Sequence, residues 1–266
     1  YRKVAQKAII YTILDQDATY QNYVAKAWPD VRIFYNASQF WCLAYPWKQA
    51  VPESWHYFME GDFTHEHIIE DHGALTGQYY SYGDGKKQAG DPEHRHGDTS
   101  WMKQTPWGSF GTYDFISEGD SPAFLHLVDV GLDNLEHPEY GGWGGRLAQS
   151  KEQPNRWEDG AEVLDFNPFT DTLDATYPQT RWLKALQEDF AARADWCVLP
   201  YEQANHPPQV KLNHENHLQA LAGSSLTRSA SASDPDGDAL AYQWWQYADV
   251  DSYPGTIELV HSNHSE

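Results

Sequence analysis

The sequence predicts an α/β domain followed by a smaller β-rich module, and two observations carry this prediction. Near the N-terminus, two apolar runs rich in β-branched residues, 8–14 and 31–35, flank a segment of helical character at 19–27. Near Asn205 the composition changes, and small polar residues with two-residue alternation replace mixtures of Trp and His. Strand, helix and strand in this order predict a parallel pair with a right-handed crossover, whereas alternation with turn residues predicts antiparallel strands.

The first predicted strand ends at acidic residues. Its apolar run is continuous, as in a strand covered on both faces, and it stops at Asp15-Gln16-Asp17. Pro29-Asp30 then separates the predicted helix from the second strand. Functional groups in parallel sheets gather at the carboxyl ends of the strands, so Asp15 and Asp17 are candidate site residues.

The middle of the chain predicts short helices joined by turn-rich segments. Residues 53–59 and 65–71 have helical character, and 83–106 is a long polar excursion with little periodicity. The Gly-rich segment 141–146 lacks the Lys and the spacing of a phosphate loop. The clearest helix is predicted for 181–196. Its apolar residues recur every three to four positions: Trp182, Leu183, Leu186, Phe190 and Ala194.

Asp120 stands just before a predicted helix. It follows a short apolar run, 110–116, and the next two residues, Ser121-Pro122, are typical of an N-cap and a first helical position. A carboxylate in this place is either a helix cap or a ligand that points into a cleft. The spacing alone leaves both interpretations open.

The second module, residues 204–266 after an α/β domain of 1–203, predicts part of an immunoglobulin-like β-sandwich. One alternating strand is predicted at 226–232 and another at 240–244, joined by the turn 234–238 as a hairpin. A complete sandwich takes about 100 residues, so the module is expected to be truncated.

Two segments contain enough closely spaced Asp or His residues to be candidate metal-binding sites. The turn Asp-Pro-Asp-Gly-Asp at 234–238 is either a rigid turn or a calcium site, although it lacks the distal Glu of an EF-hand loop. The segment 65–72 holds three His, but Ile69 stands where a metalloprotease motif has its second His. The alternative for 65–72 is a polar helix rim.

Composition narrows the class of partner. Eighteen Lys and Arg against 39 Asp and Glu give a net charge of −21, which repels nucleic acid and anionic membrane surfaces. No run approaches the 18 or so apolar residues of a transmembrane helix. Twelve Trp, 17 Tyr and 10 Phe fit either sugar- or base-stacking surfaces or an aromatic core. The pairing of Cys42 and Cys197 stays open.

A series of motifs in order along nearly the whole chain resembles a known family. The segments are YTILDQD at 11–17, WP at 28–29, HGAL at 72–75, EGDSPAFL at 118–125, GWGGR at 142–146 and DFAARADWC at 189–197. With a tail opened by NHPP at 205–208 and marked by the turn 234–238, the series resembles the nucleoside-hydrolase-like family of cellulose-binding proteins, whose members carry an immunoglobulin-like tail.

The resemblance implies a nucleoside-hydrolase-like, Rossmann-like fold and glycosidic C–N cleavage, in which Ca²⁺ orients water and ribose hydroxyls while an Asp takes a proton. It makes Asp120 a candidate metal ligand, because Asp-x-Pro before a helix is similar to the late Asp-Pro ligand of nucleoside hydrolases. Asp15 and Asp17 are weaker metal candidates. Trp143 and His72 are candidate substrate-binding residues, and no catalytic residue is assigned.

One departure from the family pattern limits these expectations. Nucleoside hydrolases begin with a strand that ends in an Asp cluster, and the place for this cluster precedes Tyr1. Because Ca²⁺ takes six to eight oxygen ligands, we expect no Ca²⁺ site and no nucleoside hydrolysis in this chain alone. We also expect the first strand to lie at a sheet edge, covered by a missing N-terminal segment or by self-association.

Three functions follow from the sequence. The first is a fragment of a secreted nucleoside-hydrolase-like protein, and the alternative is a non-catalytic carbohydrate-binding protein of the cell surface. The third is a metal-dependent enzyme that uses the 65–72 segment. The expected partner is a nucleoside or a carbohydrate, and the expected location is secreted, periplasmic or on the cell surface.

Overall fold

The computed structural model describes residues 2–14, 17–39, 43, 45, 47–87, 96–100, 105, 108–116, 121–160 and 162–265. The contacts divide the chain into two compact units, unit 1 (Tyr1–Cys197) and unit 2 (Val198–Glu266).

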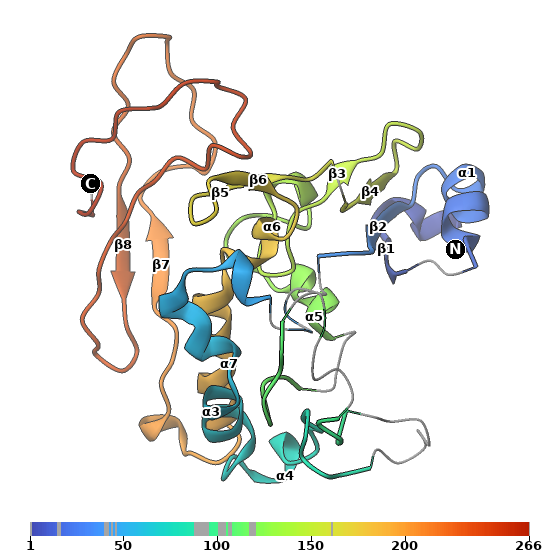
Figure 1. Ribbon diagram of the computed structural model, residues 1–266. Helices are drawn as coiled ribbons and strands as arrows, with labels where there is room; N and C mark the ends of the chain where they lie inside the picture. The colour runs from blue at the N-terminus through green and yellow to red at the C-terminus, as the bar shows by residue number, and fades with distance from the viewer. Residues whose placement is uncertain are drawn as a thin grey trace. The chain divides into compact units, whose positions relative to one another are not determined.

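Unit 1 contains a four-stranded sheet in the order β1-β2-β4-β3 (Figure 1). The strands are β1 (Ile9–Ile13), β2 (Arg32–Asn36), β3 (Ala148–Gln149) and β4 (Arg156–Glu158). β1 and β4 both run parallel to β2, whereas β3 is antiparallel to β4. The predicted parallel pair of the first two strands is therefore confirmed, and β1 lies at an edge of this sheet among the described strands.

The connection between β1 and β2 is helical, as the sequence predicts. β1 ends before Leu14, whose φ of 51° leaves the extended region, and Thr19 then begins the helical turns η2 (Tyr20–Val24) and α1 (Ala25–Ala27). Trp28 follows α1 with extended φ and ends it. A right-handed helical crossover of this kind is the short route between parallel neighbours.

The register of the first two strands sorts their side chains onto two faces. Ile10 pairs with Ile33, and both lie in the cluster with Ala25 of α1, which covers one face. Tyr11 pairs with Phe34, and their rings lie near His126 on the opposite face. Alternation with a period of two places successive residues on opposite faces, so both faces of this sheet are covered.

The second face is covered by the helical turns α5 (Ser121–Phe124) and η6 (Leu125–Leu127). The Tyr11 hydroxyl donates to the carbonyl of Ala123, and the rings of Tyr11 and Phe124 are 5.7 Å apart. α5 begins at Ser121 itself, so Ser121 is a helical residue here and not the N-cap that the sequence predicts. Turn η7 (Pro138–Tyr140) leads from η6 toward the Gly-rich loop and β3.

A second part of unit 1 is mainly helical and packs around α7 (Leu183–Asp195), the helix that the sequence predicts most clearly. Leu183 is fully buried with Val51 and Met59. The remaining short helices of unit 1 are η1 (Arg2–Lys7), η3 (Lys48–Ala50), η4 (Glu53–Met59), α3 (Gly61–Thr64), η5 (His65–Ile69), α4 (Gly73–Thr76) and α6 (Tyr177–Thr180). The predicted helix at 53–59 thus coincides with η4. A separate hairpin pairs β5 (Asp165–Asn167) with β6 (Thr172–Asp174).

Unit 2 holds one turn, η8 (Tyr201–Gln203), and one antiparallel pair, β7 (Gln209–Leu212) with β8 (Ala230–Ser233). The predicted hairpin between 226–232 and 240–244 is wrong, because β8 pairs with β7 and the described residues 240–244 form no strand. A two-stranded sheet among the described residues of unit 2 does not amount to a β-sandwich.

The turn 234–238 is closed by its own hydrogen bonds and is bound to the start of the module. Asp234 Oδ1 accepts bonds from the backbone N–H groups of Asp236 and Asp238, which makes a compact local turn with Gly237 at a φ of 82°. Asp236 then accepts from both the backbone N–H and the ring Nδ1 of His206, at 2.6 and 3.0 Å. The turn is therefore fastened to the start of the module. The later chain returns to β8 only at Ser265, whose carbonyl accepts from the backbone N–H of Ala230 at 2.9 Å, and the described residues 240–244 do not pair with β8.

Candidate functional site

The loop that carries Trp143 depends on close backbone approaches. Gly142 and Gly145 exchange two backbone hydrogen bonds of 3.0 and 2.9 Å. A Cβ atom on Gly144 would collide with the backbone of His126, and a Cβ atom on Gly145 would collide with the side chain of Gln39. Gly145 also has a φ of 91°, which glycine adopts without strain. The sequence GWGGR is thus a tight turn in which only glycine fits at positions 144 and 145.

Gln39 fixes the end of this loop. Its side chain is almost fully buried, its Oε1 accepts from the backbone N–H of Arg146 at 2.8 Å, and its Nε2 donates to the Arg146 carbonyl at 2.9 Å. A side-chain amide that satisfies both backbone groups of one residue holds that residue as a strand partner would. The loop after β2 therefore sets the position of the Trp143 loop through Gln39.

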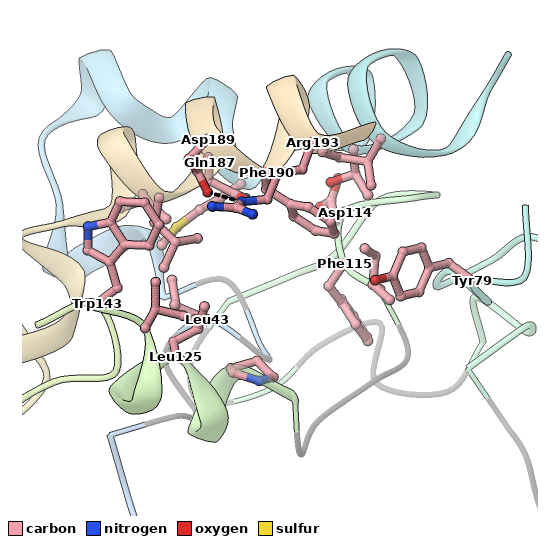
Figure 2. Close-up of a pocket in the computed structure, with 18 residues that line it drawn as sticks. Leu43, Tyr79, Asp114, Phe115, Leu125, Trp143, Gln187, Asp189, Phe190 and Arg193 are labelled. Atoms are coloured by element: carbon pink, nitrogen blue, oxygen red, sulfur yellow. Dashed lines mark hydrogen bonds and ion pairs between the residues drawn. The ribbon is translucent and has the colours of Figure 1, made fainter. Parts of the chain in front are cut away.

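Trp143 lines a cavity of about 440 Å³ in unit 1 (Figure 2). Helix α7 forms one wall with Gln187, Phe190 and Arg193, while Asp114, Phe115 and Tyr79 lie on the side away from Trp143. The lining residues are mostly apolar: Leu43, Met59, Thr64, Ile68, Tyr79, Asp114, Phe115, Ile116, Pro122, Leu125, Val128, Trp143, Leu183, Leu186, Gln187, Asp189, Phe190 and Arg193. Apolar walls with a few polar groups are typical of small-molecule sites.

Two carboxylates line this cavity, and both are engaged. Asp114 accepts from the backbone N–H groups of Gly61 at 2.9 Å and Gly111 at 2.7 Å, and burial raises its pKa above the usual range. Asp189 accepts from Arg193 Nε at 2.6 Å, one helical turn away. Gln187 donates to the Phe58 carbonyl at 2.7 Å. The polar groups of the cavity are held in place before any ligand binds.

A second polar cluster lies at the carboxyl ends of β1 and β2. Asn36, the last residue of β2, is fully buried and donates to the Tyr11 hydroxyl at 3.0 Å, while its Oδ1 has no partner. Burial raises the pKa of Tyr11 and lowers that of the neighbouring His126 to about 4, so both groups are neutral at pH 7.

Asp159 closes the carboxyl end of β4. Its carboxylate accepts from the backbone N–H groups of Ala37, Ser38 and Gln39 at 2.7–2.8 Å, and also from the Ser38 hydroxyl at 3.0 Å. Successive N–H groups that converge on a carboxylate form an anion nest. Asp159 thus fixes the loop that places Gln39, and through it the Trp143 loop.

The residues that the sequence singles out fall into three groups. Asp120 and Asp15 lie outside the described residues, as does Cys42. Asp17 accepts from the Thr19 N–H at 3.0 Å in a local turn before the helix, and this bond lowers the pKa of Asp17. Trp143 lines the cavity, whereas His72 does not: His72 Nε2 lies 3.1 Å from Asp195 Oδ1, at the end of α7. A substrate-binding role for these two residues stays a prediction.

The histidines of segment 65–72 turn to separate partners. His65 pairs with Glu70 at 3.1 Å, His67 contacts the Tyr57 hydroxyl at 2.7 Å, and His72 contacts Asp195. A helix that continued over 65–72 would place His67 and Asp71 on one face. The helix ends at Ile69 instead, and Asp71 has a φ of 62°, so the expectation of a shared face is wrong.

No group of three or more His, Cys, Asp or Glu side chains within the described residues is placed to hold a metal ion. The side chains within the described residues therefore do not fit Ca²⁺, which takes six to eight oxygen ligands. Likewise, none of the helices in the described ranges has the length and hydrophobicity needed to cross a membrane.

Sequence reasoning missed most of the cavity. The sequence analysis does not point to Asp114, Gln187 or Arg193. The sequence of α7 does, however, carry a pattern that identifies its cavity-lining face. Leu186, Gln187, Asp189, Phe190 and Arg193 follow an i, i+1, i+3, i+4, i+7 pattern, so they lie along one side of the helix. A helix face that mixes apolar with paired charged residues indicates a cavity wall more than a core.

Comparison with known families agrees with the α/β architecture. Residues 1–147 match the family described as "Cellulose-binding Sde182, nucleoside hydrolase-like domain". Residues 225–266 match "Cellulose-binding protein Sde0182, C-terminal domain". No curated protein and no solved structure gives a significant match. Because the first match spans more than half of the chain, the chain belongs to the family of the cellulose-binding Sde182 nucleoside-hydrolase-like domain.

Proposed function

We propose that unit 1 binds a neutral carbohydrate in the cavity between Trp143 and α7. The observation that carries this proposal is the combination of aromatic walls, Trp143, Phe115 and Phe190, with hydrogen-bonding groups in one cavity of about 440 Å³. Sugar rings have apolar C–H faces that stack on aromatic rings and hydroxyls at their rims that need polar partners. The family descriptions, which name cellulose binding for both matched regions, support the same ligand class.

The charges favour an uncharged ligand. Two carboxylates, Asp114 and Asp189, and one guanidinium, Arg193, line the cavity, and the whole chain carries a net charge of −21. The excess of negative charge would repel a polyanionic sugar. A neutral saccharide can instead donate its hydroxyls to the carboxylates and accept from Arg193 and Gln187.

The bonding of the two carboxylates supports binding rather than glycoside hydrolysis at this cavity. Hydrolysis needs one carboxyl group as acid and another as base or nucleophile. Asp114 already accepts two backbone N–H bonds, and Asp189 is paired with Arg193. Each would have to give up these bonds to react, whereas binding uses their remaining lone pairs.

Calorimetric titration with cellobiose and cellotriose tests the proposal. The expected result is measurable binding to the intact chain that weakens at least about tenfold in Trp143→Ala, since a stacked aromatic side chain contributes about 1–3 kcal/mol. Trp157→Ala is the matched control, because Trp157 packs against Phe34 on the sheet and does not line the cavity. Equal loss in both variants, or no binding by the intact chain, would contradict the proposal.

A second candidate function is nucleoside binding with N-glycosidic hydrolysis at the carboxyl ends of β1 and β2. Its support is the buried Asn36, whose Oδ1 lacks a partner, together with the nucleoside-hydrolase-like family description. Release of free base from inosine or uridine by the intact chain, abolished in Asn36→Ala and unchanged in Trp143→Ala, would favour this function over carbohydrate binding.

We further propose that the protein acts outside the cytoplasm, as a secreted, periplasmic or cell-surface protein. A cellulose ligand is extracellular, and the family descriptions support that ligand. Fractionation of the native host, followed by detection of the protein with an antibody, tests this location.

A further inference from the structure

A buried ionic cluster connects the two walls of the cavity. Asp165 is fully buried at the start of β5, and its Oδ1 accepts from Arg146 Nη2 at 2.6 Å and from Arg146 Nε at 3.0 Å. Its Oδ2 accepts from Arg181 Nη1 at 2.8 Å. Both guanidinium side chains are also largely buried. One carboxylate therefore uses each of its oxygens for a different cation.

The two arginines belong to the two segments that supply Trp143 and the α7 wall. Arg146 is the last residue of the GWGGR turn, three positions after Trp143, and Arg146 Nη2 also bonds the Leu164 carbonyl at 3.1 Å. Arg181 stands just before α7, between α6 and the helix that supplies Gln187 and Phe190. Its guanidinium lies 5.1 Å from the Tyr177 ring centroid. Asp165 thus binds one arginine from the Trp143 turn and one arginine from the start of α7.

We propose that Asp165 is a positioning residue, which fixes the separation between Trp143 and α7 and so shapes the cavity for its ligand. The inference rests on the proposed carbohydrate-binding function for its effect on affinity. The placement of Trp143 relative to α7, however, is a property of the protein without ligand.

The chemistry of the cluster explains why a carboxylate stands here. Two guanidinium groups brought together without an anion would repel each other in a poorly solvated place. A carboxylate with two oxygens can accept from both at once through short charge-assisted bonds, and the planar guanidinium of Arg146 approaches with two of its nitrogens, which fixes its orientation. A neutral side chain of the same shape keeps the volume and loses the attraction.

Fluorine NMR of protein labelled with 5-fluorotryptophan tests the placement directly. The Trp143 resonance is assigned by its loss in Trp143→Phe, and the Trp157 resonance by its loss in Trp157→Phe. In Asp165→Asn we expect the Trp143 resonance to shift or broaden while the Trp157 resonance on β4 stays unchanged. We also expect affinity for cellotriose to fall at least about fivefold, because the walls no longer hold their separation.

Two further variants keep the inference falsifiable. Arg146→Met leaves the Asp165–Arg181 pair intact and should also shift the Trp143 resonance. This variant replaces Asp165→Asn in the test if Asp165→Asn does not fold. Ile33→Ala, in the fully buried core of the sheet, lowers stability far from the cavity walls and should leave the Trp143 resonance in place.

The outcomes separate the two proposals. An unchanged Trp143 resonance in folded Asp165→Asn and Arg146→Met, or an equal change in Ile33→Ala, would overturn the positioning role. If the intact chain binds no cellotriose, the proposed function fails, while the fluorine spectra still decide the role of Asp165.

Discussion

At the scale of single residues, His126 shows how burial changes the chemistry of a side chain. His126 is fully buried between two aromatic rings. Its ring centroid lies 6.1 Å from that of Tyr11, which it stacks on, and 5.4 Å from that of Phe34, which it meets edge to face. Desolvation disfavours the charged imidazolium, so the pKa of His126 falls to about 4 in the folded protein. In the unfolded chain the same group titrates near 6.5.

This difference predicts a loss of stability in mild acid. Between about pH 6.5 and 4 the unfolded chain binds a proton on His126 that the folded protein does not, so the free energy of unfolding falls as pH falls through this window. The loss from His126 alone is about 3 kcal/mol at pH 4. Urea unfolding of the intact chain and of His126→Phe, at pH 7 and at pH 4.5, measures it. The variant should show the smaller decrease, and equal slopes would mean that His126 is already solvated.

At the scale of elements, the GWGGR turn is the sharpest example of sequence dictated by packing. Gly145 lies against Gln39, and Gly144 lies against the backbone of His126. The turn joins the loop after β2 to the segment that follows η6, two regions far apart in the sequence. A residue larger than glycine at position 144 would displace the backbone of His126, and one at position 145 would displace Gln39.

We therefore predict that Gly145→Ala is much more destabilising than an ordinary glycine substitution. Its Cβ would meet the Gln39 side chain at a φ of 91°, so it combines backbone strain with overpacking. Gly131→Ala is the matched control, because Gly131 has a φ of 80° with open space around it and should lose only about 1 kcal/mol. Gly145→Ala should lose at least about 2 kcal/mol more in urea unfolding. Equal losses would show that Gln39 moves aside freely.

At the scale of the whole molecule, the two units differ in the size of their cores. Unit 1 has several buried clusters around the sheet and around α7. In unit 2, Ala204 and Ala230 are the only buried apolar side chains among the described residues, and large ones such as Leu221, Val210 and Val260 are exposed. Little buried apolar surface gives little stability, because burial is the main favourable contribution to folding.

We predict two separate transitions in calorimetric unfolding of the intact chain, with unit 2 melting first. Cellotriose at saturating concentration should raise only the higher transition, because a ligand stabilises the unit that binds it. Trp143→Ala, measured with and without the sugar, is the control and should abolish this shift. A single cooperative transition would show that the two units unfold as one body.

Much of the framework could be predicted from the sequence by itself, because local patterns decide it. The β-branched runs and the helical segment between them determined the parallel pair of β1 and β2, and the spacing of Leu183, Leu186 and Ala194 determined α7. The motif series indicated the family. These features depend on residues close together in the chain, where propensity and periodicity act directly.

Only the tertiary structure decided the cavity and the strand partners of unit 2. Gln39 and Asp165 both bind Arg146 at the end of the Trp143 loop, through hydrogen bonds between distant segments, and no local pattern encodes which segments meet. The pairing of β8 with β7, in place of the predicted partner at 240–244, was likewise visible only in the tertiary structure. The physical reason is that a buried polar group takes whichever partner the assembled chain brings to it, since leaving it unpaired costs more than any local preference supplies.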